Sequence, residues 1–167
     1  MNLSKQGIRF IKLGWERFSA VPYDDNGGRP GGFMTIGWGH KIRQGESFPR
    51  PITVAQADGI FFVDVSNAVR TVNRVVTVPL TQFQFDALVS LCFNIGQGRF
   101  MGSTLLKLLN ARDYAGAADQ FPLWRKSEGE ILPGLIRRRA EERDLFMTGD
   151  YTIGKCAGDG QGGVGKP

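Results

Sequence analysis

The fold is decided by residues 15–40, which read WERFSAVPYDDNGGRPGGFMTIGWGH. The glycines, Pro30 and Asn26 in this stretch are incompatible with a long helix, because these residues favour turns. Residues 33–38, FMTIGW, have the composition of a short strand. The stretch therefore predicts a β-hairpin or small sheet near the N-terminus.

A helix is expected before this sheet. Ile8, Ile11 and Trp15 recur at helical spacing, and Ser4 is a suitable N-cap. Because a proline cannot continue a helix, this first helix should end near Val21–Pro22.

Helical patterns dominate the rest of the chain. Two pairs have the spacing of a capping box, Thr53 with Gln56 and Thr81 with Gln84. Gly96 and Gly98 should stop the second of these helices. Further helices are expected after the N-caps Ser103 and Asp113, and from residue 135 to residue 146.

These elements predict an α+β fold with a small β-containing N-terminal lobe, a larger helical C-terminal lobe and a cleft between them, over residues 1–148. Residues 149–167 are rich in glycine, and we expect them to form a flexible tail.

Composition narrows the classes of function. The net charge of +5 and the pI of about 9.5 favour polyanionic partners. A single histidine and two cysteines argue against a zinc site or a disulfide framework. We find no apolar run long enough to span a membrane, no recognisable export signal, and no nucleic-acid-binding or phosphate-binding motif.

Two carboxylic acids near the lobe junction have contrasting surroundings. Glu16 follows Trp15 at a helix end, and both the aromatic contact and the helix dipole favour the protonated form that a general acid requires. Asp25 lies in a polar, glycine-rich loop that suits a charged carboxylate. Such pairs also occur on ordinary surfaces, and spacing alone does not choose between Asp24 and Asp25.

These motifs resemble the phage T4-type lysozyme family, in its lambdoid-phage branch. The family pattern places a Glu, then an Asp, then a Thr in TIGxGH, which here are Glu16, Asp25 and Thr35. The family's tyrosine two residues before the Asp falls on Tyr23 and so selects Asp25. Residues 80–110 and 134–146 also resemble the family, and nine residues separate Asp25 from Thr35, a longer loop than is usual in it.

The resemblance implies hydrolysis of the β-1,4 bond between N-acetylmuramic acid and N-acetylglucosamine in bacterial peptidoglycan. Glu16 would be the acid, Asp25 would stabilise the transition state, and Thr35 would position the attacking water, with inversion at the anomeric carbon. No metal or organic cofactor is required. The implied protein is a monomeric endolysin that accumulates in the host cytoplasm and reaches the cell wall through a phage holin.

The resemblance also assigns roles to other residues. Tyr23 and Asn94 would contact substrate, and His40 would form an ion pair with Asp64. Without the resemblance, a lone histidine and a helix-ending asparagine are more often structural.

A run of basic residues near the C-terminus is expected to form a solvated helix face that also attracts the anionic wall. Its members are Arg137, Arg138, Arg139 and Arg143.

Three alternatives remain at this point. A lytic transglycosylase would use one glutamate and release an anhydro sugar. A peptidoglycan-binding module would keep the scaffold without turnover. A nucleic-acid-binding protein would explain the basic charge but lacks a supporting motif.

Overall fold

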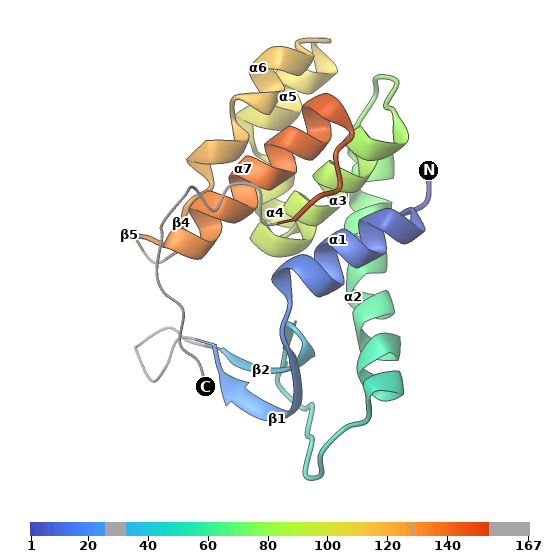
Figure 1. Cartoon of the computed structure of the whole chain (residues 1–167), viewed down its shortest axis with the longest axis vertical. Coiled ribbons are helices and arrows are strands. Elements are labelled where there is room, and N and C mark those ends of the chain that lie inside the picture. The colour runs from blue at the N-terminus through green and yellow to red at the C-terminus, as the bar shows by residue number, and fades with distance from the viewer. Residues whose placement is uncertain (26–32, 128, 154–167) are drawn as a thin grey trace, which may run out of the picture.

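The computed structural model describes residues 1–25, 33–127 and 129–153, and it has two lobes (Figure 1). The smaller lobe holds an antiparallel sheet in the order β1-β2-β3, with bounds Phe18–Asp24, Met34–Trp38 and His40–Lys41. The larger lobe is helical. The predicted α+β class is therefore confirmed.

The other regular elements among the described residues are seven α-helices, one 3-10 helix and a short hairpin. They are α1 (Lys5–Trp15), α2 (Val54–Val75), α3 (Gln82–Ile95), α4 (Gln97–Met101), α5 (Thr104–Asn110), α6 (Tyr114–Ala118), η1 (Phe121–Leu123), β4 (Lys126–Ser127), β5 (Glu130–Ile131) and α7 (Pro133–Thr148). The long helix α2 contacts β2 at one end and α3 at the other, so it connects the two lobes (Figure 1).

The helix N-termini follow the capping signals in the sequence. The side chains of Thr53 and Thr81 each accept a hydrogen bond from the N3 backbone, and the side-chain oxygen of the glutamine at N3 accepts one from the backbone N–H of the cap residue. The side chains of Ser4, Ser103 and Asp113 also accept backbone N–H bonds at their helices. Each bond satisfies a donor that the first helical turn leaves without a partner.

The end of the first helix differs from its prediction. The helix α1 stops at Trp15, and β1 runs through Val21 and Pro22, where the helix was expected to end. Proline is tolerated here because β1 is an edge strand, and its pairing with β2 is irregular between Ser19 and Tyr23. Glu16 is therefore the C-cap residue, with extended backbone (φ −106°, ψ 125°), and lies where the chain passes from helix to sheet.

The main core lies in the helical lobe around α3. Eight consecutive residues of α3, from Phe85 to Cys92, are buried, as expected for a helix surrounded on all sides. Helices α2 and α7 pack against it, and α1 also contacts it. A smaller core of Ile36, Ile52 and Ala57 joins the sheet to the start of α2.

The prediction that four arginines of α7 form a solvated face is wrong for two of them. Arg138 and Arg139 are buried, and both lie about 3 Å from the buried carboxylate of Glu142. Burial lowers the pKa of Arg139 to about 10, although the charge of Glu142 opposes that shift. Arg143 does lie at the surface, where it pairs with Asp119. The pattern of charges along α7 did not distinguish these two environments.

Ordered structure continues beyond the expected end of the catalytic domain at residue 148. The hydroxyl of Tyr151 donates to Asp86 of α3 (2.7 Å), and the Tyr151 ring packs edge-on against Phe10 of α1. Burial and the bond to Asp86 raise the pKa of Tyr151 to about 12. The first residues of the predicted tail therefore pack against α1 and α3, and residues 154–167 of that tail lie outside the described part of the chain.

We expect Asp86→Ala to lower the free energy of unfolding by about 3 kcal/mol, because it leaves several partly buried donors without an acceptor. The fully buried Asp86 carboxylate accepts hydrogen bonds from Ser4, Gln82 and Tyr151. Urea unfolding followed by tryptophan fluorescence measures the change. Asp119→Ala removes one exposed ion pair and should cost less than about 1 kcal/mol. Equal losses in the two variants would contradict the role of Asp86.

Candidate active site

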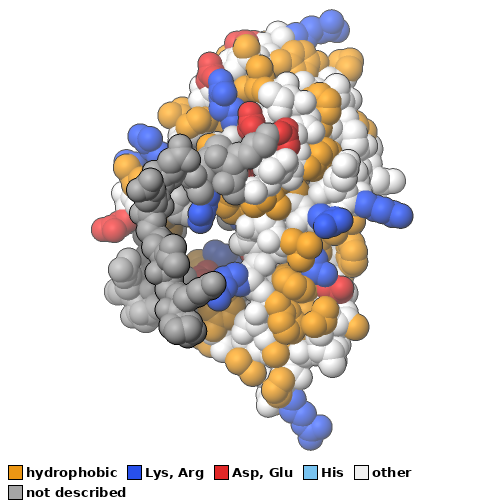
Figure 2. Space-filling view, in the orientation of Figure 1, with side chains coloured by type: hydrophobic (Ala, Val, Ile, Leu, Met, Phe, Trp, Pro, Cys, Tyr) orange, Lys and Arg blue, Asp and Glu red, His pale blue; other side chains and the backbone are white. Residues whose placement is uncertain are grey.

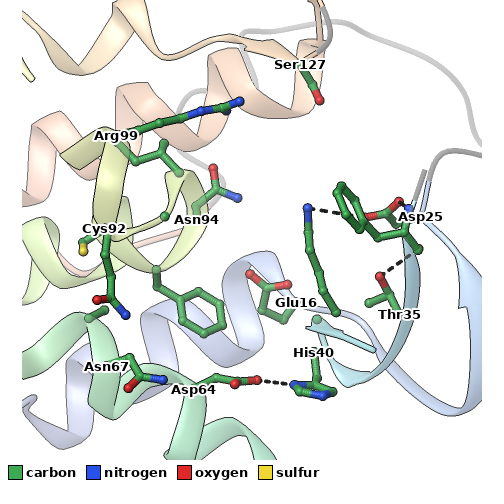
Figure 3. Close-up of a pocket in the computed structure, with 18 of the residues that line it drawn as sticks. Glu16, Asp25, Thr35, His40, Asp64, Asn67, Cys92, Asn94, Arg99 and Ser127 are labelled. Carbon is green, nitrogen blue, oxygen red and sulfur yellow. Dashed lines mark hydrogen bonds and ion pairs between the residues drawn. The ribbon is translucent and has the colours of Figure 1, made fainter. Parts of the chain in front are cut away.

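A cleft of about 810 Å³ lies between the lobes and brings together all seven predicted site residues. Glu16, Tyr23, Asp25 and Thr35 line it from the α1–β1 junction and the sheet, and Asn94 lines it from the end of α3. In Figure 3 the Glu16 carboxylate projects into the open space between Asn94 on one side and the Asp25–Thr35 pair on the other. Helical lobe and sheet thus contribute opposite walls.

Glu16 is closely enclosed. Its side chain is 14% exposed, and its Oε1 accepts a hydrogen bond from Arg138 Nη1 at 3.0 Å. On the other side lies Gly39, where a Cβ atom would stand only 2.2 Å from Glu16 Oε2. The sequence-based expectation for Glu16 did not include this contact with Arg138.

A chain of buried polar contacts fixes Arg138 in turn. Its Nε lies 3.1 Å from Glu142 Oε1, which also accepts a hydrogen bond from Ser90. Arg139, beside it, donates to the side-chain oxygen of Asn94 at 3.0 Å. The acceptor of the Asn94 amide is therefore engaged, and its exposed NH₂ group points into the cleft (Figure 3).

Asp25 and Thr35 lie on the same face of the sheet. The strand register pairs Tyr23 with Thr35 and Asp24 with Met34. Because side chains alternate along a strand, Tyr23, Asp25 and Thr35 share the cleft face, whereas Asp24 belongs to the opposite face. This alternation separates the two adjacent aspartates, which the spacing in the sequence could not do.

The backbone of Phe33 connects Asp25 to Thr35. Its N–H donates to Asp25 Oδ1 at 2.8 Å, and its carbonyl accepts from the Thr35 hydroxyl at 3.2 Å. A further bond, from Asp25 N to Phe33 O, closes the pair of strands. The long loop between Asp25 and Thr35 therefore leaves these residues on paired backbone.

Tyr23 lies within electrostatic range of both acids. Burial raises its pKa, and the negative charges of Glu16 and Asp25 raise it further, while Arg17 acts in the opposite direction. The phenol is thus neutral at physiological pH and can donate a hydrogen bond in the cleft.

His40 lies at the floor of the cleft between two carboxylates. Its Nδ1 is 2.6 Å from Asp64 Oδ2, the pairing that the sequence predicted, and its Nε2 is 2.9 Å from Glu46 Oε2 (Figure 3 shows the former). Arg43 also binds Asp64. These contacts tie the loop after β3 to α2 and so hold the sheet against the long helix.

Basic side chains border the cleft. Figure 2 shows a hollow near the middle of the molecule, with Lys and Arg side chains at its edge. The cationic residues that line the cleft are Lys41, Arg43, Arg99 and Lys126. A cleft with this rim suits a substrate that carries negative charge.

Sequence reasoning missed Gly39, Arg138, Phe33 and Glu46. Gly39 had a visible signal, since glycines in TIGWGH suggest close backbone approach. Arg138 had none, because nothing local distinguishes it from Arg137 and Arg143, which lie at the surface of the same helix. Within the described residues, no group of three or more His, Cys, Asp or Glu side chains is arranged to hold a metal ion. No helix in this part of the chain is both long and apolar enough to cross a bilayer.

Glu16→Gln should lower the pKa of Tyr23, because it removes one of the negative charges that disfavour the phenolate. The pKa should stay above its ordinary value, since burial is the larger cause. An NMR titration of the Tyr23 ring gives the shift. Glu46→Gln is the control, because Glu46 does not contribute to the Tyr23 environment. A Tyr23 pKa that is unchanged in Glu16→Gln would contradict the proximity of the two residues.

Known phage endolysins are similar to this chain in sequence. The chain is 39% identical over 155 residues to an endolysin of Bacillus phage B103, covering 90% of this chain but 56% of that protein. It is 39% identical over 152 residues to the endolysin of Salmonella phage P22, covering 89% of this chain and 99% of the relative. It therefore spans about half the length of the first of these relatives and nearly all of the second.

A solved structure agrees with the sequence comparison. The endolysin of Escherichia coli O157:H7 phage FAHEc1 superposes with a TM-score of 0.79 at 34% identity, over 91% of this chain and 97% of that one. The sequence profile described as phage lysozyme matches residues 13–142, which include the α1–β1 junction, the sheet and most of the helical lobe. The chain belongs to the phage lysozyme family.

Proposed function

We propose that this protein is an endolysin that hydrolyses the β-1,4 bond between N-acetylmuramic acid and N-acetylglucosamine in bacterial peptidoglycan. The observation that carries the proposal is the enclosed Glu16 carboxyl in one cleft with the Asp25–Thr35 pair. Membership of the phage lysozyme family and endolysin relatives support it.

In this mechanism Glu16 protonates the glycosidic oxygen as the bond breaks. Asp25 stabilises the positive charge that develops on the sugar, and the Thr35 hydroxyl, whose proton is donated to Phe33 O, offers its lone pairs to the attacking water. Attack from the face opposite the leaving group inverts the anomeric carbon, and the attacking water passes its proton to the Asp25 carboxylate. The reaction needs only acid, carboxylate and water, so no cofactor takes part.

Hydrolysis is favoured over the transglycosylase alternative by the placement of Asp25 and Thr35. Both side chains face the cleft and are joined through one backbone residue, which gives a polar site for water beside Glu16. A transglycosylase has no use for such a water site. The presence of Glu16 in the cleft likewise favours an enzyme over a binding module.

The family relationship extends the proposal to biology. We propose that the protein acts as a monomer, accumulates in the cytoplasm of an infected bacterium, and reaches the wall through a holin. The cationic rim of the cleft and the net charge of +5 would favour contact with the anionic wall.

The first test compares wild type with Glu16→Gln on chloroform-permeabilised Gram-negative cells, followed by turbidity. The variant should be slower by roughly a hundredfold or more, because glutamine cannot deliver the acid proton. Glu130→Gln, an exposed glutamate on β5, is the matched control and should clear cells like wild type. Equal clearing by wild type and Glu16→Gln would overturn the role of Glu16.

The products distinguish the reaction types. Mass spectrometry of released fragments should show reducing sugars, whereas an anhydro product, lighter by one water, would establish a transglycosylase. NMR of the first product should show the inverted α-anomer. A retained β-anomer would instead make Asp25 a nucleophile.

Gly39→Ala should lower kcat at least tenfold while the protein stays folded, because the added methyl occupies the space of Glu16 Oε2. Gly45→Ala is a matched control: Gly45 also has positive φ, but a Cβ there would meet no atom within 4 Å. Both variants should lose about 1 kcal/mol of stability from backbone strain. If kcat falls equally in both, strain rather than displacement of Glu16 is the cause.

A further inference from the structure

Phe33 is an aromatic side chain in the cleft for which the mechanism has no role. Its side chain is 51% exposed and lines the cleft together with Asp25 and Thr35. Single exposed apolar residues are common on protein surfaces, and Met34 next to it is 49% exposed. Phe33 differs from Met34 because it lines the cleft, whereas Met34 pairs with Asp24 on the other face of the hairpin.

The position of Phe33 is fixed on two sides. Its backbone N–H and carbonyl bond to Asp25 and Thr35, the residues proposed to handle the water. Its ring lies 4.0 Å from the Lys41 ammonium, a cation–π contact that orients the ring. Lys41 also lies 4.0 Å from Asp25 Oδ2. The ring therefore has a defined place beside Asp25 and costs little further ordering on binding.

We propose that Phe33 is a stacking platform for one amino-sugar ring of the glycan strand, on the Asp25 side of the cleft, and that it determines how tightly the strand is held. Pyranose rings present C–H faces that pack against aromatic rings, and Lys41 places a donor beside the sugar's hydroxyl and carboxyl oxygens. This inference rests on the proposed glycan-cleaving function but concerns binding, and it assigns no chemical step to Phe33.

The platform lies at the end of the connection between Asp25 and Thr35, which are separated by nine residues. Phe33 is the residue at which that connection rejoins the paired strands. Its side chain thereby adds a contact for substrate at the edge of the water site.

The experiment measures initial release of reducing ends from purified peptidoglycan sacculi as a function of sacculus concentration. Phe33→Ala should raise the half-saturating concentration about tenfold, which corresponds to about 1.4 kcal/mol of binding free energy. Its kcat should change less than threefold. Phe33→Leu, which keeps apolar bulk without an aromatic face, should behave like Phe33→Ala, and Phe33→Tyr should behave like wild type. Met34→Ala is the matched control and should leave both parameters unchanged.

Sedimentation of the same variants with sacculi, each carrying Glu16→Gln, separates binding from turnover. Weaker binding for the Ala and Leu variants supports the platform, and binding equal to that of Glu16→Gln alone overturns it. If wild type releases no reducing ends but Phe33→Ala still weakens sedimentation, the proposed hydrolysis fails while the binding platform stands. If the Leu variant binds and saturates like wild type, the aromatic face is not used and the inference is wrong.

Discussion

The ion pair between Glu16 and Arg138 joins residues 122 positions apart, and the architecture of the cleft depends on it. Glu16 belongs to the junction of α1 and β1, whereas Arg138 belongs to α7 at the other end of the chain. Removing a largely buried carboxylate and a buried guanidinium from water costs free energy unless each group has a partner of opposite charge. Their contact therefore fixes the end of α1 against α7, and with it the wall of the cleft that carries the acid.

The cost of burying Arg138 and Arg139 explains the polar groups around them. Glu142 lies between the two guanidinium groups, Ser90 donates to Glu142, and Asn94 accepts from Arg139. The network thus leads from the proposed acid to the Asn94 amide at the cleft. Because each of these side chains contacts another member of the network, loss of any one of them is expected to disturb both ends.

Local signals in the sequence were enough for the caps, the small sheet and the two-lobed α+β class, whereas the grouping of Glu16, Asp25 and Thr35 in one cleft came from the resemblance to the lysozyme family. Long-range packing was not accessible to them. The predicted first helix was too long because it ran to Pro22. A strand at the edge of a sheet tolerates proline, but that β1 is such an edge strand depends on strands that come later in the chain. Arg138 and Arg143 look alike in sequence, and only the packing of α7 on α3 buries the first and exposes the second.

Nine residues separate Asp25 from Thr35, yet the strands remain paired where this connection leaves and rejoins the sheet. The strand pairs Tyr23–Thr35 and Asp24–Met34 keep the register on both sides, and Phe33 closes the ladder with bonds to Asp25. A shift of one residue would turn Asp25 and Thr35 away from the cleft, because side chains alternate along the strands. Extra residues are therefore compatible with the site only between Asp25 and Phe33, where they leave the orientation of the Asp25 and Thr35 side chains unchanged.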